Sequence, residues 1–282
     1  MTHATVADRA ASLKARDGQR PSRDAVVLSL TGPRSGAAEW NPWQVAHLLV
    51  IADSLAFHGP ERAERPSDPR LYPQVAGRIL DADVDLVARQ GWTARDGWWA
   101  LTKDPVVWGE YLPRADYLLI GVGGMDQLPT PVPTWLRESI PYIRQGRVRR
   151  AARDALRAST PSLVRAVGGP FRTLPQAATD RYLSRMVQGV RAVRPDLPIA
   201  LLSPPPWTGE YYPSTRAHAP AVVAARAWAA REAVAYVDVE PLVAPRLMTC
   251  NPDGMHWSWE VHALVGEAVA AAASGREGVT PG

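Results

Sequence analysis

Five short apolar runs constrain the fold of this chain more than any other feature of its sequence. They lie at residues 47–52, 84–88, 116–122, 197–202 and 234–238. Continuous apolar runs of this length are typical of strands that are covered on both faces. Helical patterns lie between and after them, at about 70–80, 134–157, 176–194, 218–232 and 259–273. Strands that alternate with helices predict an α/β fold, a single doubly wound, flavodoxin-like parallel sheet sandwiched by helices.

The predicted α/β domain occupies residues 47–274. Residues 1–46 mix charged residues, Gly and Pro without a steady period, so we expect a partly flexible N-terminal extension there. Residues 275–282 are expected to form a flexible C-terminal tail. Residues 158–175, which include several Pro and Gly residues, are expected to form a loop between two helices.

Cysteine content and hydropathy indicate the compartment. Cys250 is the single cysteine, which excludes an internal disulfide and fits a reducing environment. No apolar run approaches the roughly 20 residues that a membrane-spanning helix needs. The run at 25–30 is too short for the core of a secretory signal. We therefore expect a cytoplasmic protein without a membrane span.

The charge of the chain is modestly basic, with a formal net charge of +4. Part of this charge is a group of arginines between residues 144 and 157, in which Arg150, Arg153 and Arg157 have helical spacing. We favour a solvated helix face for them. The alternative is attraction of an anionic substrate or of a phosphate-bearing acyl carrier protein. No nucleic-acid motif and no metal-ligand cluster accompanies the charge, so neither partner is predicted.

Ser54 follows the first predicted strand directly. The carboxyl end of a parallel strand is the edge at which such sheets bind ligands. A serine at that point begins a helix or turn, and its backbone N–H group is suited to stabilising an oxyanion. The alternative is that Asp53 and Ser54 only cap a helix.

A second set of polar residues precedes the last predicted helix. Asp253 lies three residues before His256 in a Pro/Gly turn. A serine hydroxyl becomes a good nucleophile when an imidazole accepts its proton, and a carboxylate fixes the tautomer of that imidazole. Ser54, Asp253 and His256 are therefore the candidate catalytic residues. His262, inside the following helix, is expected to be structural.

An early strand followed by Asp-Ser-Leu and a late Asp-x-x-His before the final helix together resemble the SGNH (GDSL) hydrolase superfamily. Two further blocks of that superfamily have counterparts, at residues 90–93 and 123–126. The resemblance implies a serine hydrolase fold with an oxyanion hole formed by the N–H groups of Ser54, Gly91 and Gly124.

One position departs from the superfamily pattern. Met125 replaces the asparagine whose side-chain amide completes the oxyanion hole, and a thioether donates no hydrogen bond. Gln127 is one candidate to supply the missing donor, and backbone N–H groups alone are the other. An inactive member of the superfamily is a further alternative.

A more specific resemblance is to an actinobacterial subgroup, the diglucosylglycerate octanoyltransferases. It rests on residues 53–60, 91–100, 112–116, 123–129 and 251–257, and the subgroup shares Met125. The resemblance implies transfer of an octanoyl group from coenzyme A or a carrier-protein thioester to a sugar hydroxyl, with no further cofactor. Ser54 would carry the acyl group, His256 would act as base, and Asp253 would orient His256.

Residues beside these motifs are candidates for substrate binding. Aromatic side chains exclude water and pack against sugar rings, although core packing is the alternative for each of them. Arg95 and Asp96 suit sugar hydroxyls or a carboxylate, but a local ion pair is equally consistent with them. The proline-rich segment 203–213 follows a strand and is expected to border the cleft. The full set of candidates is Asp53, Trp92, Arg95, Asp96, Met125, Asp126, Gln127, Trp207, Tyr211 and Trp257.

Three other functions stay open on the sequence alone. The first is acyl transfer to a different acceptor, such as a glycosylated natural product. The second is simple ester hydrolysis, and the third is a catalytically silent glycan-binding protein that keeps only the cleft.

Overall fold

A five-stranded parallel sheet forms the centre of the domain. The computed structural model describes residues 45–249 and 253–275. The strand order is β2-β1-β3-β6-β7, which confirms the predicted flavodoxin-like sheet. The strands are β1 (Ala46–Ala52), β2 (Ala82–Ala88), β3 (Tyr117–Gly121), β6 (Ile199–Leu202) and β7 (Ala235–Val237). Residues 1–44 of the expected extension, Cys250 and residues 276–282 of the expected tail lie outside the described residues.

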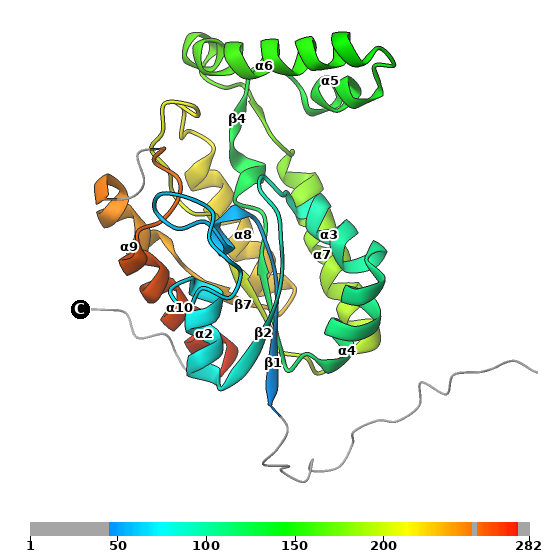
Figure 1. Ribbon diagram of the computed structural model, residues 1–282, viewed down its shortest axis with the longest axis vertical. Coiled ribbons are helices and arrows are strands. Elements are labelled where there is room, and N and C mark those ends of the chain that lie inside the picture. The colour runs from blue at the N-terminus through cyan, green and yellow to red at the C-terminus, as the bar shows by residue number, and fades with distance from the viewer. Residues whose placement is uncertain (1–44, 250–252, 276–282) are drawn as a thin grey trace, which may run out of the picture. The chain divides into compact units, whose positions relative to one another are not determined.

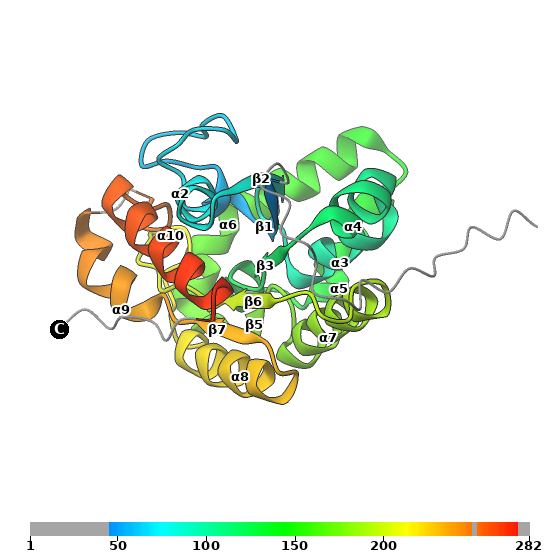
Figure 2. The same ribbon diagram turned by 90° about the horizontal axis from the view of Figure 1, so that it is seen from below.

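Helices cover both faces of the sheet (Figure 2). On one face lie α2 (Tyr72–Leu80), α9 (Glu240–Val243) and α10 (Trp259–Ala273). On the other lie α3 (Ala94–Lys103), α4 (Leu112–Arg114), α7 (Gln176–Val193) and α8 (His218–Arg231). Short helical turns complete the fold: η1 (Ser54–Ala56), η2 (Val107–Tyr111), η3 (Met125–Gln127), η4 (Ile140–Tyr142) and η5 (Ala244–Thr249).

The central strands are apolar on both sides because each side faces a different layer of helices. In β1, Leu49 and Ile51 pack against the layer that contains α3 and α7. Leu48 and Val50 alternate with them and pack against the layer that contains α2 and α10. Successive side chains of a strand point to opposite faces, so a doubly covered strand needs an unbroken apolar run. This explains why the apolar runs predicted the strands correctly.

An inserted segment, residues 131–170, leaves and rejoins the domain through a two-stranded antiparallel sheet. Its strands are β4 (Pro129–Thr130) and β5 (Phe171–Arg172). The segment carries α5 (Thr134–Ser139) and α6 (Gly146–Val167), which lie beyond the carboxyl ends of the parallel strands (Figure 1). The insertion therefore faces the edge of the sheet at which a ligand is expected.

The helix boundaries in this insertion differ from the sequence prediction. Residues 134–157 form two helices rather than one, and α6 continues to Val167 where a loop was expected. Pro161 lies inside α6 and removes one backbone hydrogen bond. The hydroxyl groups of Ser159 and Thr160 donate to carbonyl groups of the preceding turn, at 2.7 Å to Ala155 and 2.6 Å to Leu156. These side-chain bonds accompany the proline within a continuous helix.

Candidate active site

Ser54 lies where the buried strand β1 ends. Asp53 caps the turn η1, since its Oδ1 accepts the N–H of Leu55 at 3.0 Å. This cap places Ser54 at the first position of the turn, with 6% of its surface exposed. Burial raises the pKa of Asp53 to about 7, against the hydrogen bond from Leu55 and helped by the charge of Asp126. The predicted capping role of Asp53 and the candidate nucleophile Ser54 therefore occur together.

His256 connects Ser54 to Asp253. Its Nε2 lies 3.2 Å from the Oγ of Ser54, and its Nδ1 lies 2.6 Å from Oδ2 of Asp253. The other oxygen of Asp253 accepts the backbone N–H groups of Met255 at 2.9 Å and His256 at 3.1 Å. The three predicted catalytic residues thus form a serine–histidine–aspartate triad, in which the histidine can accept the serine proton.

The electrostatics of this triad suit a base that is ready to accept a proton. Burial lowers the pKa of His256, although Asp253 opposes this effect through its hydrogen bond and its charge. Burial tends to raise the pKa of Asp253, but hydrogen bonds from Met255 and His256 outweigh it and lower the pKa. At neutral pH the carboxylate is therefore ionised and the imidazole is neutral.

A second histidine, His58, covers one face of the catalytic imidazole. The rings of His58 and His256 stack with their centroids 3.6 Å apart and an angle of 19° between their planes. The Nδ1 of His58 lies 2.7 Å from the carbonyl oxygen of Gly59, which orients the ring. This contact was not predicted, although His58 lies in the motif block 53–60, because the stacking depends on the path of the chain after η1.

His262 has the structural role that was predicted for it. It is fully buried, with Nδ1 accepting the N–H of Tyr72 at 3.2 Å and Nε2 lying 3.1 Å from the carbonyl oxygen of His58. Burial lowers the pKa of His262 to about 4. This neutral histidine joins α10 to α2 and to the segment that carries His58.

Two glycines belong to the candidate oxyanion hole beside Ser54. Gly91 follows β2 with a φ of 73°, a conformation that favours glycine, and a Cβ added there would lie 4.0 Å from Cε of Met125. Gly124 packs closely against Pro205. The backbone N–H groups of Ser54, Gly91 and Gly124 remain the candidate donors to an oxyanion.

Gln127 does not replace the missing asparagine, contrary to one of the two sequence interpretations. Its side chain is 2% exposed, and its Nε2 donates to the carbonyl oxygen of Pro205 at 3.1 Å. Its Oε1 lies 3.0 Å from Nδ1 of His218. The amide therefore holds the segment after β6 against α8, and Gln127 does not line the cavity in front of Ser54.

The cavity in front of Ser54 is small and mostly apolar. Its volume of about 20 Å³ has room for roughly one water molecule. Three predicted substrate-binding residues line it, namely Asp53, Met125 and Trp207. The indole N–H of Trp207 donates to the carbonyl oxygen of Tyr212 at 2.9 Å, which fixes the ring. The full lining is Asp53, Ser54, Leu55, Gly124, Met125, Leu128, Pro205, Pro206, Trp207, Met255 and His256.

Three other predicted substrate-binding residues have structural roles instead. Trp257 is fully buried beside Tyr72 in the core, so no substrate reaches it in this structure. Asp96 caps α3, because its Oδ2 accepts the backbone N–H of Thr93 at 2.9 Å. Asp126 is 3% exposed and accepts the N–H of Ala94 at 3.1 Å. These contacts tie α3 to the catalytic edge of the sheet.

The remaining candidates lie outside the catalytic cavity. Trp92 is half-buried against the core, with the guanidinium of Arg89 5.9 Å from the centroid of its ring. The guanidinium of Arg95 lies 5.0 Å from the ring centroid of Trp99. Tyr211 is 40% exposed and lines a larger neighbouring cavity.

Comparison with solved structures shows the fold. A lipase/acylhydrolase from Enterococcus faecalis superposes with a TM-score of 0.53 at 13% identity, over 84% of this chain and 100% of the other. A variant of the acetylxylan esterase Axe2 from Geobacillus stearothermophilus superposes with a TM-score of 0.51 at 16% identity, over 82% and 95%. This chain therefore shares the α/β fold of these two enzymes.

Comparison with curated proteins identifies the family. The diglucosylglycerate octanoyltransferase of Mycolicibacterium hassiacum is 40% identical over 227 residues, which cover 78% of this chain and 91% of that protein. The enzyme of the same name from Mycobacterium tuberculosis is 39% identical over 225 residues, covering 78% and 89%. The chain belongs to the diglucosylglycerate octanoyltransferase family. It is an acyltransferase enzyme. No protein-family model matches the chain.

Within residues 45–249 and 253–275, no three His, Cys, Asp or Glu side chains gather where they could hold a metal ion. In the same part of the chain, no helix is long and apolar enough to cross a membrane.

Proposed function

We propose that this protein transfers an octanoyl group from a thioester donor to a hydroxyl group of diglucosylglycerate or a closely related glycoside. The proposal rests on the hydrogen-bonded line from Ser54 through His256 to Asp253, together with membership of the octanoyltransferase family. The donor is an acyl-coenzyme A or an acyl carrier protein, which present the same thioester.

In the first step, the Oγ of Ser54 attacks the thioester carbonyl carbon while Nε2 of His256 accepts the serine proton. The negative charge that develops on the carbonyl oxygen is stabilised by the N–H groups of Ser54, Gly91 and Gly124. The carbon–sulfur bond then breaks, the thiol leaves with the proton from His256, and Ser54 carries an octanoyl ester. Asp253 stays ionised and stabilises the transient imidazolium.

In the second step, a sugar hydroxyl takes the place of the thiol. Nε2 of His256 accepts the hydroxyl proton as the sugar oxygen attacks the acyl carbon, and Ser54 leaves with that proton. Transfer exceeds hydrolysis only when water is scarce beside the ester. The cavity of about 20 Å³ in front of Ser54 has room for roughly one water molecule, which limits the water that can compete with the sugar hydroxyl.

Mass spectrometry of the products tests the proposal. Wild-type protein is incubated with octanoyl-coenzyme A or octanoyl carrier protein, with and without diglucosylglycerate, and compared with Ser54→Ala and Cys250→Ser. We expect acylated sugar from wild type and from Cys250→Ser, with an intact-mass increase of one octanoyl group, and neither from Ser54→Ala. Activity that persists in Ser54→Ala would exclude the serine mechanism. Octanoate without acylated sugar would show a hydrolase or a different acceptor.

A further inference from the structure

A second, larger cavity lies between the inserted segment and the catalytic edge of the sheet. Its volume is about 270 Å³. Pro129 lines it, whereas the preceding residue, Leu128, lines the catalytic cavity. Tyr211 lines it as well, whereas Trp207 of the same segment lines the catalytic cavity. The two cavities are therefore neighbours, built from consecutive parts of the same two segments.

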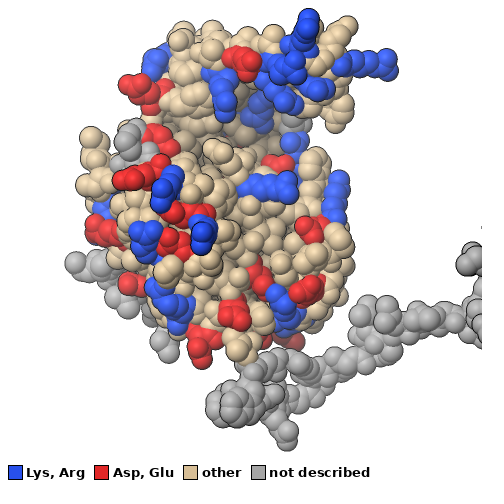
Figure 3. Space-filling model, viewed as in Figure 1, with Lys and Arg blue, Asp and Glu red and all other residues tan. Residues whose placement is uncertain are grey.

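The inserted segment brings positive charge to this cavity. Residues 134–167 contain eight arginines and two acidic residues. Figure 3 shows basic side chains gathered over α5 and α6, above the hollow that separates these helices from the rest of the domain. Three of these arginines, Arg137, Arg153 and Arg157, line the cavity.

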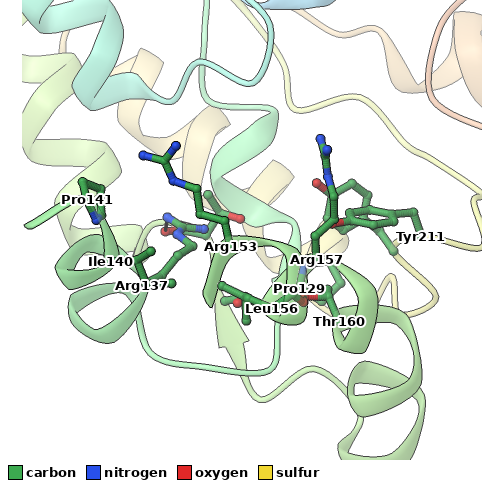
Figure 4. A pocket seen from close by; sticks show the side chains of 12 residues that line it. Pro129, Arg137, Ile140, Pro141, Arg153, Leu156, Arg157, Thr160 and Tyr211 are labelled. Carbon is green, nitrogen blue, oxygen red and sulfur yellow. Dashed lines mark hydrogen bonds between the residues drawn. The ribbon is translucent and has the colours of Figure 1, made fainter. Parts of the chain in front are cut away.

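Arg153 and Arg157 are available to a ligand. They are four residues apart on α6, and their guanidinium groups extend from the same side of the helix (Figure 4). Within the described part of the chain, neither has a hydrogen bond or an ion pair. Arg137 differs, because it donates to the carbonyl oxygen of Thr173 at 2.7 Å and so connects α5 to the strand β5 region. A concave site with two unpaired guanidinium groups is suited to a carboxylate or phosphate.

Two tyrosines form the wall beside the arginines. Tyr211 and Tyr212 pack edge to face, with ring centroids 4.7 Å apart, and Tyr211 lies next to Arg157 (Figure 4). Burial raises the pKa of Tyr212 to about 12, helped by Tyr211 and opposed by the charges of Arg137 and Arg157. The phenol is therefore a neutral hydrogen-bond donor in a basic site. Rings with a hydroxyl group present an apolar face and a polar tip to a sugar.

We propose that this cavity binds the sugar acceptor, with Arg153 and Arg157 holding its carboxylate and Tyr211 and Tyr212 contacting a sugar ring. The proposal rests on the proposed acyl transfer and assigns the acceptor's place in it. Both the acyl donor, through the phosphates of coenzyme A, and the acceptor, through its carboxylate, carry negative charge. The short separation between this cavity and the catalytic cavity favours the acceptor. The phosphates of coenzyme A are separated from its thioester by a long pantetheine arm, whereas an acceptor must reach Ser54 from the neighbouring cavity.

Steady-state kinetics with two acceptors tests this assignment. One acceptor is diglucosylglycerate, and the other is its carboxamide, which has the same shape without the charge. The variants are Arg153→Gln and Arg157→Gln, and the matched control is Arg150→Gln, an exposed α6 arginine that does not line the cavity. We expect each cavity variant to raise KM for diglucosylglycerate roughly tenfold or more, as for loss of a charged hydrogen bond. The KM values for the carboxamide and for octanoyl-coenzyme A should stay at the wild-type level.

An unchanged acceptor KM in both cavity variants would overturn the assignment. A rise in the donor KM alone would do the same, because it would place the donor's phosphates on these arginines. Intact-mass measurement of the octanoyl ester on Ser54 distinguishes failure of the acceptor-site assignment from failure of the proposed acyl transfer. If the ester forms, the acyl-transfer proposal stands and only the acceptor site is in question. If wild type forms neither the ester nor the product, calorimetric binding of diglucosylglycerate shows whether the cavity binds the acceptor. Weaker binding by the cavity variants than by Arg150→Gln supports the site, and equal binding or none by wild type removes it.

Discussion

The imidazole of His256 is held at three points before any substrate binds. Asp253 fixes Nδ1, Ser54 faces Nε2, and His58 stacks on the ring at 3.6 Å between centroids. Such contacts restrict the ring to the orientation in which it can accept the serine proton. Little reorganisation of the base is then needed at the moment of reaction.

The pH dependence of acylation follows from the lowered pKa of His256. Because burial lowers this pKa below its ordinary value of about 6.5, the base is neutral across neutral pH, and the rate falls only on acidification below that value. A positive charge on His58 also lowers the pKa of His256. We therefore expect His58→Phe, which keeps an aromatic ring, to move the acidic limb of kcat/KM for a small ester to higher pH.

The measurement is a pH–rate profile of both proteins at constant ionic strength. An acidic limb that stays in place in His58→Phe would show that His58 acts on His256 through packing alone. A limb that moves to lower pH would contradict the electrostatic argument.

Among single residues, the sequence predicted those that occupy a fixed position relative to a strand or a helix. Ser54 had to follow a strand, and Asp253 and His256 had to share a turn before the last helix. The stack of His58 on His256 was not predictable in the same way, because it depends on the path of the chain after η1. Gln127 was misinterpreted because its two hydrogen-bond partners, Pro205 and His218, lie far from it in sequence.

Among the elements, the catalytic turn depends on the segment that follows β6. The N–H of Thr208 donates to the carbonyl oxygen of Gly254 at 2.9 Å. A Cβ at Gly254 would overlap the carbonyl oxygen of Thr208, and a Cβ at Gly209 would overlap that of Asp253. Two glycines therefore allow the backbones to approach closely enough to hold Asp253 and His256 in place.

Gly254→Ala should consequently damage the site more than the fold. Its φ of 67° costs an alanine about 1 kcal/mol, and the overlap with Thr208 forces the turn to move. A displacement of about 1 Å lowers catalysis roughly a hundredfold, which we expect in kcat/KM for a small ester. Gly275→Ala is the matched control, because its φ is 66° and nothing lies within 4 Å. Equal activity in the two variants would show that the close approach is not needed.

Two helix boundaries differ from those that the local sequence predicted, one in the insertion and one at the start of α3. Pro161 favoured a loop after residue 157, yet α6 runs through it, and the hydroxyl groups of Ser159 and Thr160 donate to carbonyl groups of the preceding turn. The start of α3 was likewise missed. Residues 91–100 were interpreted as a family motif with substrate-binding candidates, and no helix was predicted there. In the structure, Thr93 and Asp96 form a capping box that begins a helix at Ala94.

Across the whole described domain, catalysis and the proposed acceptor site belong to different structural layers. Neither of the two buried apolar clusters that flank the parallel sheet includes a residue of the insertion 131–170. The sheet and its covering helices position Ser54 and His256, while the insertion contributes the arginines. The fold of the first part was predictable from five apolar runs. The second part was not, because a cavity between segments has no local sequence pattern.

Replacing residues 131–170 with a tight turn between β4 and β5 should separate the two functions. We expect the shortened protein to unfold cooperatively and to form the octanoyl ester on Ser54. Transfer to diglucosylglycerate should fall by roughly a hundredfold or more, since the acceptor is no longer oriented, and octanoate release should replace it. Thermal unfolding, intact mass and product analysis measure these quantities. Acceptor transfer at the wild-type rate would show that the insertion has no part in it.

β4 and β5 pair through only two residues each, yet this pairing fixes both ends of the insertion. The entropic cost of a loop between fixed ends grows slowly, by about 0.6 kcal/mol for each doubling of its length. A change in the length of this segment is therefore expected to leave the distance between Ser54 and His256 unchanged. The segment is a natural unit for recombination. A set of hybrids that share one catalytic domain and differ only between β4 and β5 would sample acceptor preference while keeping the acylation step constant.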